Sequence, residues 1–165
     1  MKENSTKLLT RLALLVALSA VAAYVPLPSP TGTVALDSAP GYFAVLLFGG
    51  YKGAIVLALG HIFSSLKTAF PLGALHLLIA ILMGGCGIVF SLLKKKLNIV
   101  ISSLITVLLN GVVLPLILIP ILGYGFFAAM LLPLLTGSLL NVFVAVVLYR
   151  LLKNKLEGVG DENKT

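Results

Sequence analysis

Residues 39–66 read APGYFAVLLFGGYKGAIVLALGHIFSSL, and this stretch decides the fold. Read as one helix, it makes a single long membrane crossing; read as two helices, it makes two short crossings. Gly49, Gly50 and Gly53 favour a break in its middle, because glycine destabilises a helix interior. Lys52 also favours a break, since a charged group within the hydrocarbon layer is costly. The break determines on which side of a membrane all later segments lie.

The composition is that of an integral membrane protein. Of the 165 residues, 59% are hydrophobic and 10% are charged, and the mean hydropathy is +1.14. Such a chain has too little polar surface to cover a soluble globule, and its apolar runs match the roughly 20 residues that cross a bilayer. The net charge of +7 is not arranged as a basic stripe with interleaved aromatic residues. A lipid bilayer is therefore the predicted environment, and no nucleic-acid partner is expected.

With the break, the sequence predicts six crossings, at about residues 12–26, 39–50, 53–66, 72–93, 99–120 and 126–149. The predicted fold is an all-α integral membrane protein, a bundle of six transmembrane helices. It forms a single domain over residues 1–152, followed by a polar cytoplasmic tail over residues 153–165. An even number of crossings places both termini on the same side.

The basic residues support this topology through the positive-inside rule. Six crossings leave Lys67 as the one basic residue outside, and the others on the cytoplasmic side with both termini. Without the break, the basic run 94–96 and the cluster at Arg150 would face outward. The predicted cytoplasmic set is Lys2, Lys7, Arg11, Lys52, Lys94, Lys95, Lys96, Arg150, Lys153, Lys155 and Lys164.

The first predicted helix carries small residues along one face. Ala13, Ala17 and Ala20 recur at i, i+4 and i+7, a spacing that lets another helix approach closely in lipid. The alternative is that alanine is simply common in membrane helices. The same segment also resembles a secretory signal peptide, with a basic start and a small-residue cleavage pattern at residues 20–22. We prefer the membrane helix, because cleavage would remove the small-residue face.

Residues 26–40, PLPSPTGTVALDSAP, form the long polar interruption after that helix. Their prolines and glycine exclude a continuous helix, whereas Ser38 can cap a new helix with Pro40 in its first turn. Asp37 is the one carboxylate remote from the chain ends. These features predict an ordered loop over a binding site, and a plain connector is the alternative.

Polar residues from several segments share the outer half of the predicted bundle. Because polar side chains in a membrane face a cavity or a partner, their common depth indicates a pocket that opens outward. Each also has an ordinary structural role as its alternative, such as a packed histidine, a lysine that reaches the interface, or an aspartate at a helix start. The inner half is almost wholly apolar and is assigned Cys86, Ser91, Ser103 and Asn141. The candidate binding residues are Asp37, Tyr42, His61, Ser65, Lys67, His76 and Asn110.

Catalytic and metal-binding motifs are absent from the sequence. It contains no GxxxxGK[ST], HExxH or GxSxG pattern, and its single cysteine, Cys86, is predicted on the inner side, away from both histidines. His61 and His76 stand apart without a nearby pair of carboxylates. No catalytic residue, metal site or cofactor is predicted.

The basic N-terminus, the Ala13-x-x-x-Ala17 pattern, the long first loop and six helices in about 165 residues resemble the S components of energy-coupling-factor (ECF) vitamin transporters. The resemblance implies a multi-pass protein of a bacterial plasma membrane that binds a vitamin-like solute with high affinity and is not an enzyme. It implies three partner subunits, namely a transmembrane coupling subunit and two ATP-binding subunits. Ala13, Ala17 and Ala20 would contact the coupling subunit, and Asp37 and Tyr42 would lie where the first loop closes over the vitamin.

Within that family, the run TGTVALDSAPGYFAVLLFGGYKGAIVLALGHIFSSL, followed by FPLGALHLLIA, resembles the branch assigned to α-ribazole, a cobalamin precursor. This implies ribose contacts from Asp37, Ser65 and Asn110 and a ring contact from His61 or His76. Tyr42, Phe43 or Phe70 would offer an aromatic face. Two functions of other classes remain as alternatives, a bacterial membrane scaffold of the cell-shape type and a self-sufficient solute carrier.

Overall fold

The computed structural model describes residues 5–158, with side chains described as far as residue 153. Lys2, Lys164 and the tail 159–165 lie outside the described residues. The described chain is all-helical, as predicted. Its elements are α1 (Ser5–Ala22), η1 (Leu36–Ser38), α2 (Ala39–Phe48), α3 (Gly50–Lys67), α4 (Leu75–Lys96), α5 (Ile99–Leu108), η2 (Leu109–Val113), α6 (Leu114–Ile117) and α7 (Ile119–Gly158).

The stretch 39–66 folds as two helices that pack side by side. Gly49 separates α2 from α3 and has φ +91°, a left-handed conformation that glycine adopts without strain. A Cβ added at Gly41 would lie 2.7 Å from the Leu57 side chain, and one added at Gly53 would meet Val45. These pairs are symmetric about Gly49, so α2 and α3 form an antiparallel hairpin. A single long helix over this stretch is excluded.

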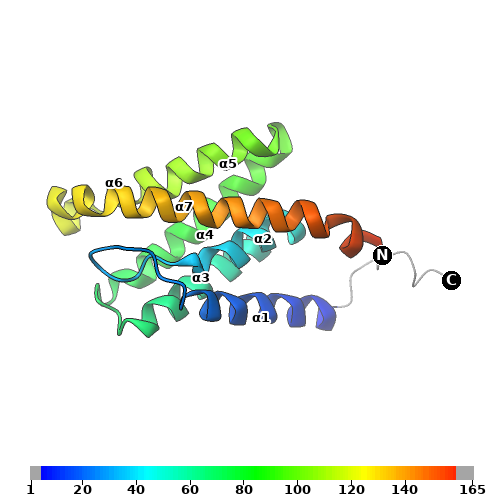
Figure 1. Ribbon diagram of the computed structural model, residues 1–165, viewed down its shortest axis with the longest axis horizontal. Helices are drawn as coiled ribbons and strands as arrows, with labels where there is room; N and C mark the ends of the chain where they lie inside the picture. Colours follow the sequence, from blue (N-terminus) through cyan, green and yellow to red (C-terminus); the bar gives the residue numbers. More distant parts are fainter. Residues whose placement is uncertain (1–4, 159–165) are drawn as a thin grey trace.

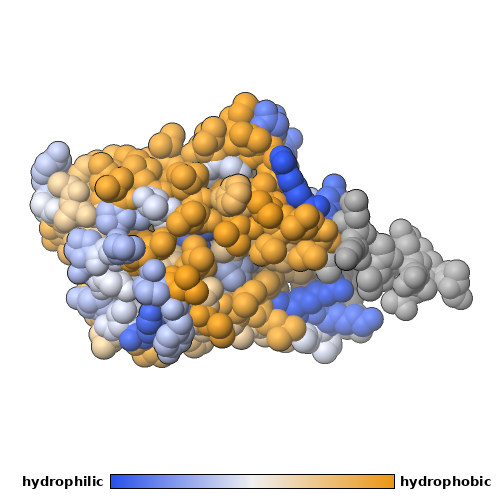
Figure 2. Space-filling model, in the orientation of Figure 1, coloured by the Kyte–Doolittle hydropathy of each residue, from blue (hydrophilic) through white to orange (hydrophobic). Residues whose placement is uncertain are grey.

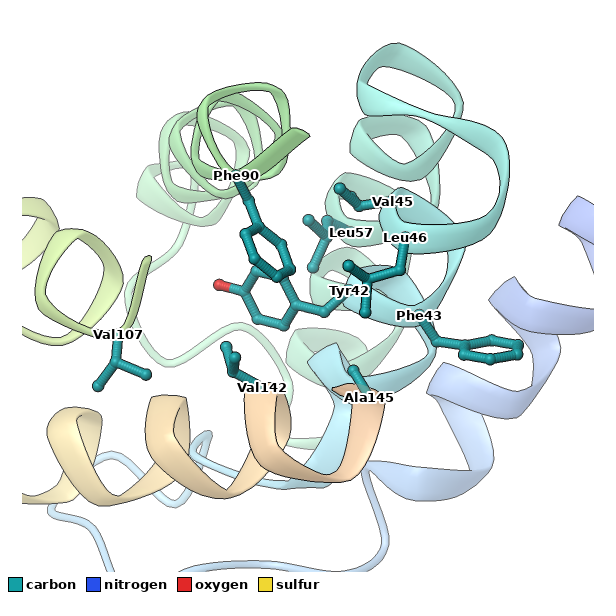
Figure 3. Packing of buried hydrophobic residues seen from close by; sticks show 9 residues of the cluster. All are labelled: Tyr42, Phe43, Val45, Leu46, Leu57, Phe90, Val107, Val142 and Ala145. Atoms are coloured by element: carbon teal, nitrogen blue, oxygen red, sulfur yellow. The ribbon is translucent and has the colours of Figure 1, made fainter. Parts of the chain in front are cut away.

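Helix α2 lies at the centre of the bundle. Eight of its ten residues are buried, in keeping with its lack of a polar face. Figure 3 shows Tyr42 among apolar side chains from other helices, with Leu57 from α3 and Val142 from α7. The Tyr42 ring meets the Phe90 ring edge-on, with centroids 6.1 Å apart. This apolar cluster comprises Tyr42, Phe43, Val45, Leu46, Leu57, Phe90, Val107, Val142 and Ala145.

Helices α5, η2 and α6 follow one another without a loop and form one continuous helical segment. Its hydrogen-bond pattern changes from α to π and back to α along its length. Pro115 lacks an N–H and cannot donate to the carbonyl of Gly111, four residues earlier. The wide π-helical turn η2 lies just before that proline. Gly111 allows close packing there, because an added Cβ would lie 2.9 Å from Cα of Leu135 in α7. The turn places Asn110 opposite α7.

The bundle has two ends with hydrophilic residues and an apolar middle (Figure 2). Figure 1 shows the start of α1, the α4–α5 connection and the end of α7 at one end, and the 26–35 loop with the α3–α4 connection at the other. Figure 2 shows a broad hydrophobic band between these ends. Four described helical spans are long and apolar enough to cross a membrane: Ser5–Ala22, Leu75–Lys96, Ile99–Ile117 and Ile119–Lys153. Six crossings, with both termini on one side, remain a prediction.

The observed helix bounds differ from the predicted ranges mainly at the polar ends. Helix α1 begins at Ser5 rather than near residue 12, and α7 continues to Gly158 rather than ending near residue 149. A helix satisfies its own backbone groups and can extend beyond the hydrocarbon layer into water, where apolar patterning gives no signal. At the other end, Gly123, with φ 79°, interrupts the α7 assignment.

Candidate functional site

A cavity of about 80 Å³ lies under the loop between α1 and α2. Its walls combine apolar side chains with hydroxyl, imidazole, amide and carboxyl groups. The loop, η1 and every helix except α1, α2 and α5 contribute to it. The lining residues are Thr31, Thr33, Val34, Ala35, Asp37, Ser38, His61, Leu72, His76, Ile79, Met83, Asn110, Leu114, Pro115, Leu118, Phe126, Met130, Leu134, Gly137, Ser138 and Asn141.

The loop between α1 and α2 folds back on itself as a short hairpin, and its second half lines the cavity. The N–H of Leu27 donates to the carbonyl of Val34 at 2.8 Å, and the N–H of Leu36 donates to the carbonyl of Val25 at 3.3 Å. Gly32 makes the turn with φ +64°. The far strand of this hairpin then lies on α7, where a Cβ added at Gly137 would be 2.6 Å from Cγ1 of Val34. The loop is therefore an ordered cover, as predicted, and not a plain connector.

His61 and His76 meet at the cavity wall. Their ring centroids are 5.3 Å apart, and Nε2 of His61 lies 3.2 Å from Nδ1 of His76. The N–H of Leu72 donates to Nε2 of His76 at 3.3 Å, so a neutral His76 carries its proton on Nδ1. The Ser65 hydroxyl donates to the carbonyl of His61 at 2.8 Å and lies 2.8 Å from Nδ1 of His76. It therefore accepts from that imidazole.

This network also fixes the other histidine. The Nδ1–H of His76 is shared between the Ser65 hydroxyl and Nε2 of His61, which lie 2.8 and 3.2 Å from Nδ1. Because that proton faces Nε2 of His61, this nitrogen is an acceptor and a neutral His61 carries its proton on Nδ1. Among the described residues, no hydrogen bond uses Nδ1 of His61. Phe70, which has φ 52°, places its ring edge-on to the His76 ring, with the centroids 5.7 Å apart. In this network the Nδ1–H of His61, a residue of the cavity wall, is left as a donor for a bound molecule.

Asp37 lies in η1, ahead of the membrane-spanning helices, and only 5% of it is exposed. Burial raises the pKa of its carboxyl to about 7, whereas hydrogen bonds from Ser64 and Ser38 act in the opposite direction. The Ser38 hydroxyl donates to Oδ1 of Asp37 at 3.3 Å. At neutral pH the carboxyl is therefore present in both protonation states and can donate as well as accept.

Two amides face the cavity from the α5–α7 side. Nδ2 of Asn110 donates to the Ser138 hydroxyl at 2.8 Å, which joins the wide turn η2 to α7. Nδ2 of Asn141 donates to two carbonyls, those of Ala35 and Gly137, at 2.8 Å each. The Ala35 contact ties the loop to α7.

The structure brings together most of the residues that the sequence predicted for the site. Asp37, His61, His76 and Asn110 line the cavity. Ser65 is not a lining residue, but its hydroxyl contacts both histidines. Two candidates lie elsewhere. Tyr42 is fully buried in the apolar cluster, and Lys67 is exposed, with Nζ donating to the carbonyl of Ala23 at 2.8 Å and 5.0 Å from the Tyr24 ring centroid.

Sequence reasoning missed Asn141 and Ser138, and it assigned Asn141 to the inner half of the bundle. The structure places both residues at the cavity, because the loop and η1 enter the bundle and meet α7 at Asn141. One signal was available in the sequence: Gly137, Ser138 and Asn141 fall on one face of a helix that is otherwise almost wholly apolar. Phe126, rather than Tyr42 or Phe43, is the aromatic lining residue.

The small-residue face of α1 points away from the bundle. Ala13 and Ala17 are exposed and Ala20 is half-buried, whereas Ser19 is fully buried on the opposite face against Gly60 of α3. Within residues 5–158, no group of three His, Cys, Asp or Glu side chains is placed to hold a metal ion.

An all-helical bundle with membrane-length helices has, beneath its first loop, a cavity lined by both apolar and polar side chains, an arrangement typical of membrane proteins that bind a small molecule. The chain belongs to the family of ECF-type riboflavin transporter S components, whose family model matches residues 3–157. It is therefore a multi-pass membrane protein and a transporter's substrate-binding subunit, not an enzyme. S components of this kind work with an energy-coupling module and a small vitamin-like substrate.

A solved structure of the S component of a bacterial ECF transporter has the same fold. It superposes with a TM-score of 0.71 at 20% sequence identity, and the match covers 93% of this chain and 99% of the other. A comparison with curated proteins gave no match. Family membership argues against a cell-shape scaffold, and neither matching description names α-ribazole.

Proposed function

We propose that this S component captures a heteroaromatic solute with a hydroxylated arm from outside the cell and delivers it to an ECF coupling module. The observation that carries the proposal is the cavity beneath the loop between α1 and α2, whose lining combines apolar side chains with carboxyl, imidazole and amide groups. Apolar side chains such as Ile79, Met83 and Phe126 suit a flat ring, and the polar groups suit hydroxyls and ring heteroatoms.

Riboflavin is the first candidate solute, because the matching family is described as a riboflavin transporter S component. In the present form the cavity holds only about 80 Å³, whereas sites for drug-sized ligands measure roughly 300–1,000 Å³. A vitamin therefore enters only if the loop moves off α7, and it widens the cavity once inside.

α-Ribazole is the second candidate. The stretches that resemble its branch, residues 31–66 and 70–80, supply Asp37, Ser38, His61 and His76 to the cavity. The resemblance thus includes residues at the site itself. Both solutes combine a dimethylated aromatic ring system with a hydroxylated arm, so the same cavity suits either.

We assign the polar contacts by chemistry. Asp37 and Asn110 bind hydroxyls of the arm, and the Nδ1–H of His61 donates to a ring nitrogen or carbonyl. Ser65 and His76 hold His61 in the required tautomer through their hydrogen bonds. Tyr42 and Lys67 stand apart from the cavity and are left out of the proposed site.

The topology and the partners are part of the same proposal. Basic residues at the start of α1 and the ends of α4 and α7 favour a cytoplasmic location for that end and both termini, with the cavity toward the outer face of a bacterial plasma membrane. The exposed face at Ala13, Ala17 and Ala20 contacts the coupling subunit, and two ATP-binding subunits supply the energy. The whole bundle then topples to deliver the solute inward.

A binding titration tests the proposed function. Purified protein in detergent is titrated with riboflavin, followed by quenching of flavin fluorescence, and with α-ribazole, thiamine and folate by calorimetry. We expect stoichiometric, submicromolar binding of riboflavin. Tight binding of α-ribazole alone would move the assignment to the second candidate, and no binding of any compound by folded protein would contradict the proposal.

Replacement of Ala13 or Ala17 by tryptophan tests the coupling face. Both side chains are exposed, so solute binding by the purified protein should be unchanged while uptake by cells that carry the coupling module is lost. Leu14→Trp, at an exposed neighbouring position, is the matched control and should retain uptake. Normal uptake by Ala13→Trp and Ala17→Trp would contradict this interface.

A further inference from the structure

Asn141 differs from the other polar residues of the cavity because its amide is only half satisfied. The side chain is 4% exposed, and both N–H groups of Nδ2 have partners, the carbonyls of Ala35 and Gly137. Oδ1 is buried and, among the described residues, has no hydrogen-bond partner. A buried acceptor without a donor is unusual and destabilising.

The orientation of this amide follows from its partners. Rotating it by half a turn would place Oδ1 against two carbonyl oxygens and lose both hydrogen bonds. Oδ1 is therefore the atom of Asn141 that still needs a hydrogen-bond donor, and Asn141 is a lining residue of the cavity. The opposite edge of the same amide holds the loop, through Ala35, against α7.

We propose that Asn141 both latches the 26–38 loop onto α7 and reads an N–H or O–H donor of the bound solute. The latch half needs no solute, whereas the donor-reading half rests on the proposed function. A solute that widens the cavity brings its donor to Oδ1 of Asn141. The amide then has hydrogen bonds on both edges, and its hydrogen bond to the carbonyl of Ala35 in the loop becomes stronger. Ligand recognition and loop closure are thus joined in one side chain.

For a flavin, we assign this donor to the imide N–H of the ring system, because the hydroxyls of the arm are assigned to Asp37 and Asn110. 3-Methylriboflavin lacks this donor and otherwise keeps the ring and the hydroxylated arm. The wild-type protein should bind it about tenfold or more weakly than riboflavin, as expected when a buried polar group is left unpaired. This comparison uses the unaltered protein and does not depend on any variant folding.

Two variants separate the roles of Asn141. Asn141→Leu removes both roles, so riboflavin binding should weaken about 10- to 100-fold and the preference over 3-methylriboflavin should disappear. Asn141→Asp removes the N–H donors and retains an acceptor, so the preference should remain although the loop is loosened. Ser103→Ala is the control and should match the wild type, because the Ser103 hydroxyl donates to the carbonyl of Ile99 within α5 and Ser103 is not a lining residue of the cavity.

Hydrogen exchange in the solute-free protein tests the latch alone. The amides of Leu27 and Leu36 close the loop hairpin and are the probes. Both Asn141 variants should exchange there about tenfold faster than the wild type, the change expected for one lost hydrogen bond of ordinary strength. Ser103→Ala should leave these rates unchanged.

The outcomes are distinct. Equal binding of riboflavin and 3-methylriboflavin by the wild type would overturn donor reading, and unchanged exchange in Asn141→Leu would overturn the latch. Absence of riboflavin binding by the wild type would overturn the flavin assignment, and with it donor reading of a flavin. The exchange rates would still decide the latch.

Discussion

The same helices build two regions of opposite character. Helix α3 places Leu57 in the apolar cluster and His61, one turn later, at the cavity. Helix α7 likewise places Ala145 in the cluster and Asn141, one turn earlier, under the loop. A single turn of helix therefore separates side chains that fill a core from side chains that line a site.

The contrast between the apolar cluster and the cavity suggests that stability and solute binding depend on different ends of the bundle. The cluster around Tyr42 is closely packed, and Lys94 reinforces its end of the bundle through hydrogen bonds of 3.1 Å to the carbonyl of Leu46 and the hydroxyl of Tyr149. The cavity end instead holds a carboxyl, two imidazoles and two amides around unfilled space. Changes in the cluster should unfold the protein, and changes at the cavity should mainly alter binding.

The largest effect is expected from Gly53→Leu. Its side chain would meet backbone and side-chain atoms of Val45 across the α2–α3 hairpin, so the hairpin cannot close as it does now. We expect a loss of at least about 3 kcal/mol of stability, measured by thermal unfolding in detergent, with loss of the monodisperse species. Gly85→Leu is the control, because a Cβ at Gly85 meets nothing within 4 Å. Comparable stability of the two variants would contradict the claim that close packing of α2 on α3 stabilises this end of the bundle.

A smaller effect, when counted per pH unit, is expected from titration of Asp37. Its pKa is about 7 in the folded protein, above the ordinary aspartate value of 3.8, so between these values the folded state binds more protons than the unfolded state. Stability should therefore be highest at the acidic end and fall by up to about 1 kcal/mol per pH unit up to about pH 7. Asp37→Asn should flatten the dependence between pH 5 and 8. An equal slope in both proteins would exclude Asp37 as its source.

The smallest effect is expected from two matched serine substitutions. Ser65 and Ser102 are both fully buried, and each hydroxyl donates to the carbonyl four residues earlier, but only Ser65 contacts the histidines. Each alanine variant should lose about 1 kcal/mol of stability. Only Ser65→Ala should also weaken solute binding, by a few-fold, because it loosens the tautomer of His61. Equal binding by the two variants would show that the histidine network does not support the site.

Much of the fold could be predicted because its signals are local. Glycines at residues 49–53 predicted a break between two helices, and the structure has α2 and α3 as an antiparallel hairpin about Gly49. The prolines of residues 26–30 ended the first helix, and the loop that follows is ordered. These features depend on backbone chemistry at single positions, which a sequence displays directly.

The depth of individual side chains could not be predicted in the same way. Asn141 was assigned to the inner half from its position along the predicted helix. That position gave no sign that the loop enters the bundle and contacts Asn141 through the carbonyl of Ala35. Tyr42 is close to Asp37 in sequence, yet its ring packs into the cluster against Phe90. Both positions depend on tertiary packing between distant segments, which neither spacing nor hydropathy reports.

The central claim is that solute enters the cavity beneath the 26–38 loop. Val34→Cys with Gly137→Cys, in a Cys86→Ala background, places two thiols where the loop lies on α7, close enough for a disulfide. We predict that the oxidised protein does not quench riboflavin fluorescence and that reduction restores quenching in the same sample. Equal riboflavin binding by the oxidised and reduced forms would contradict this account.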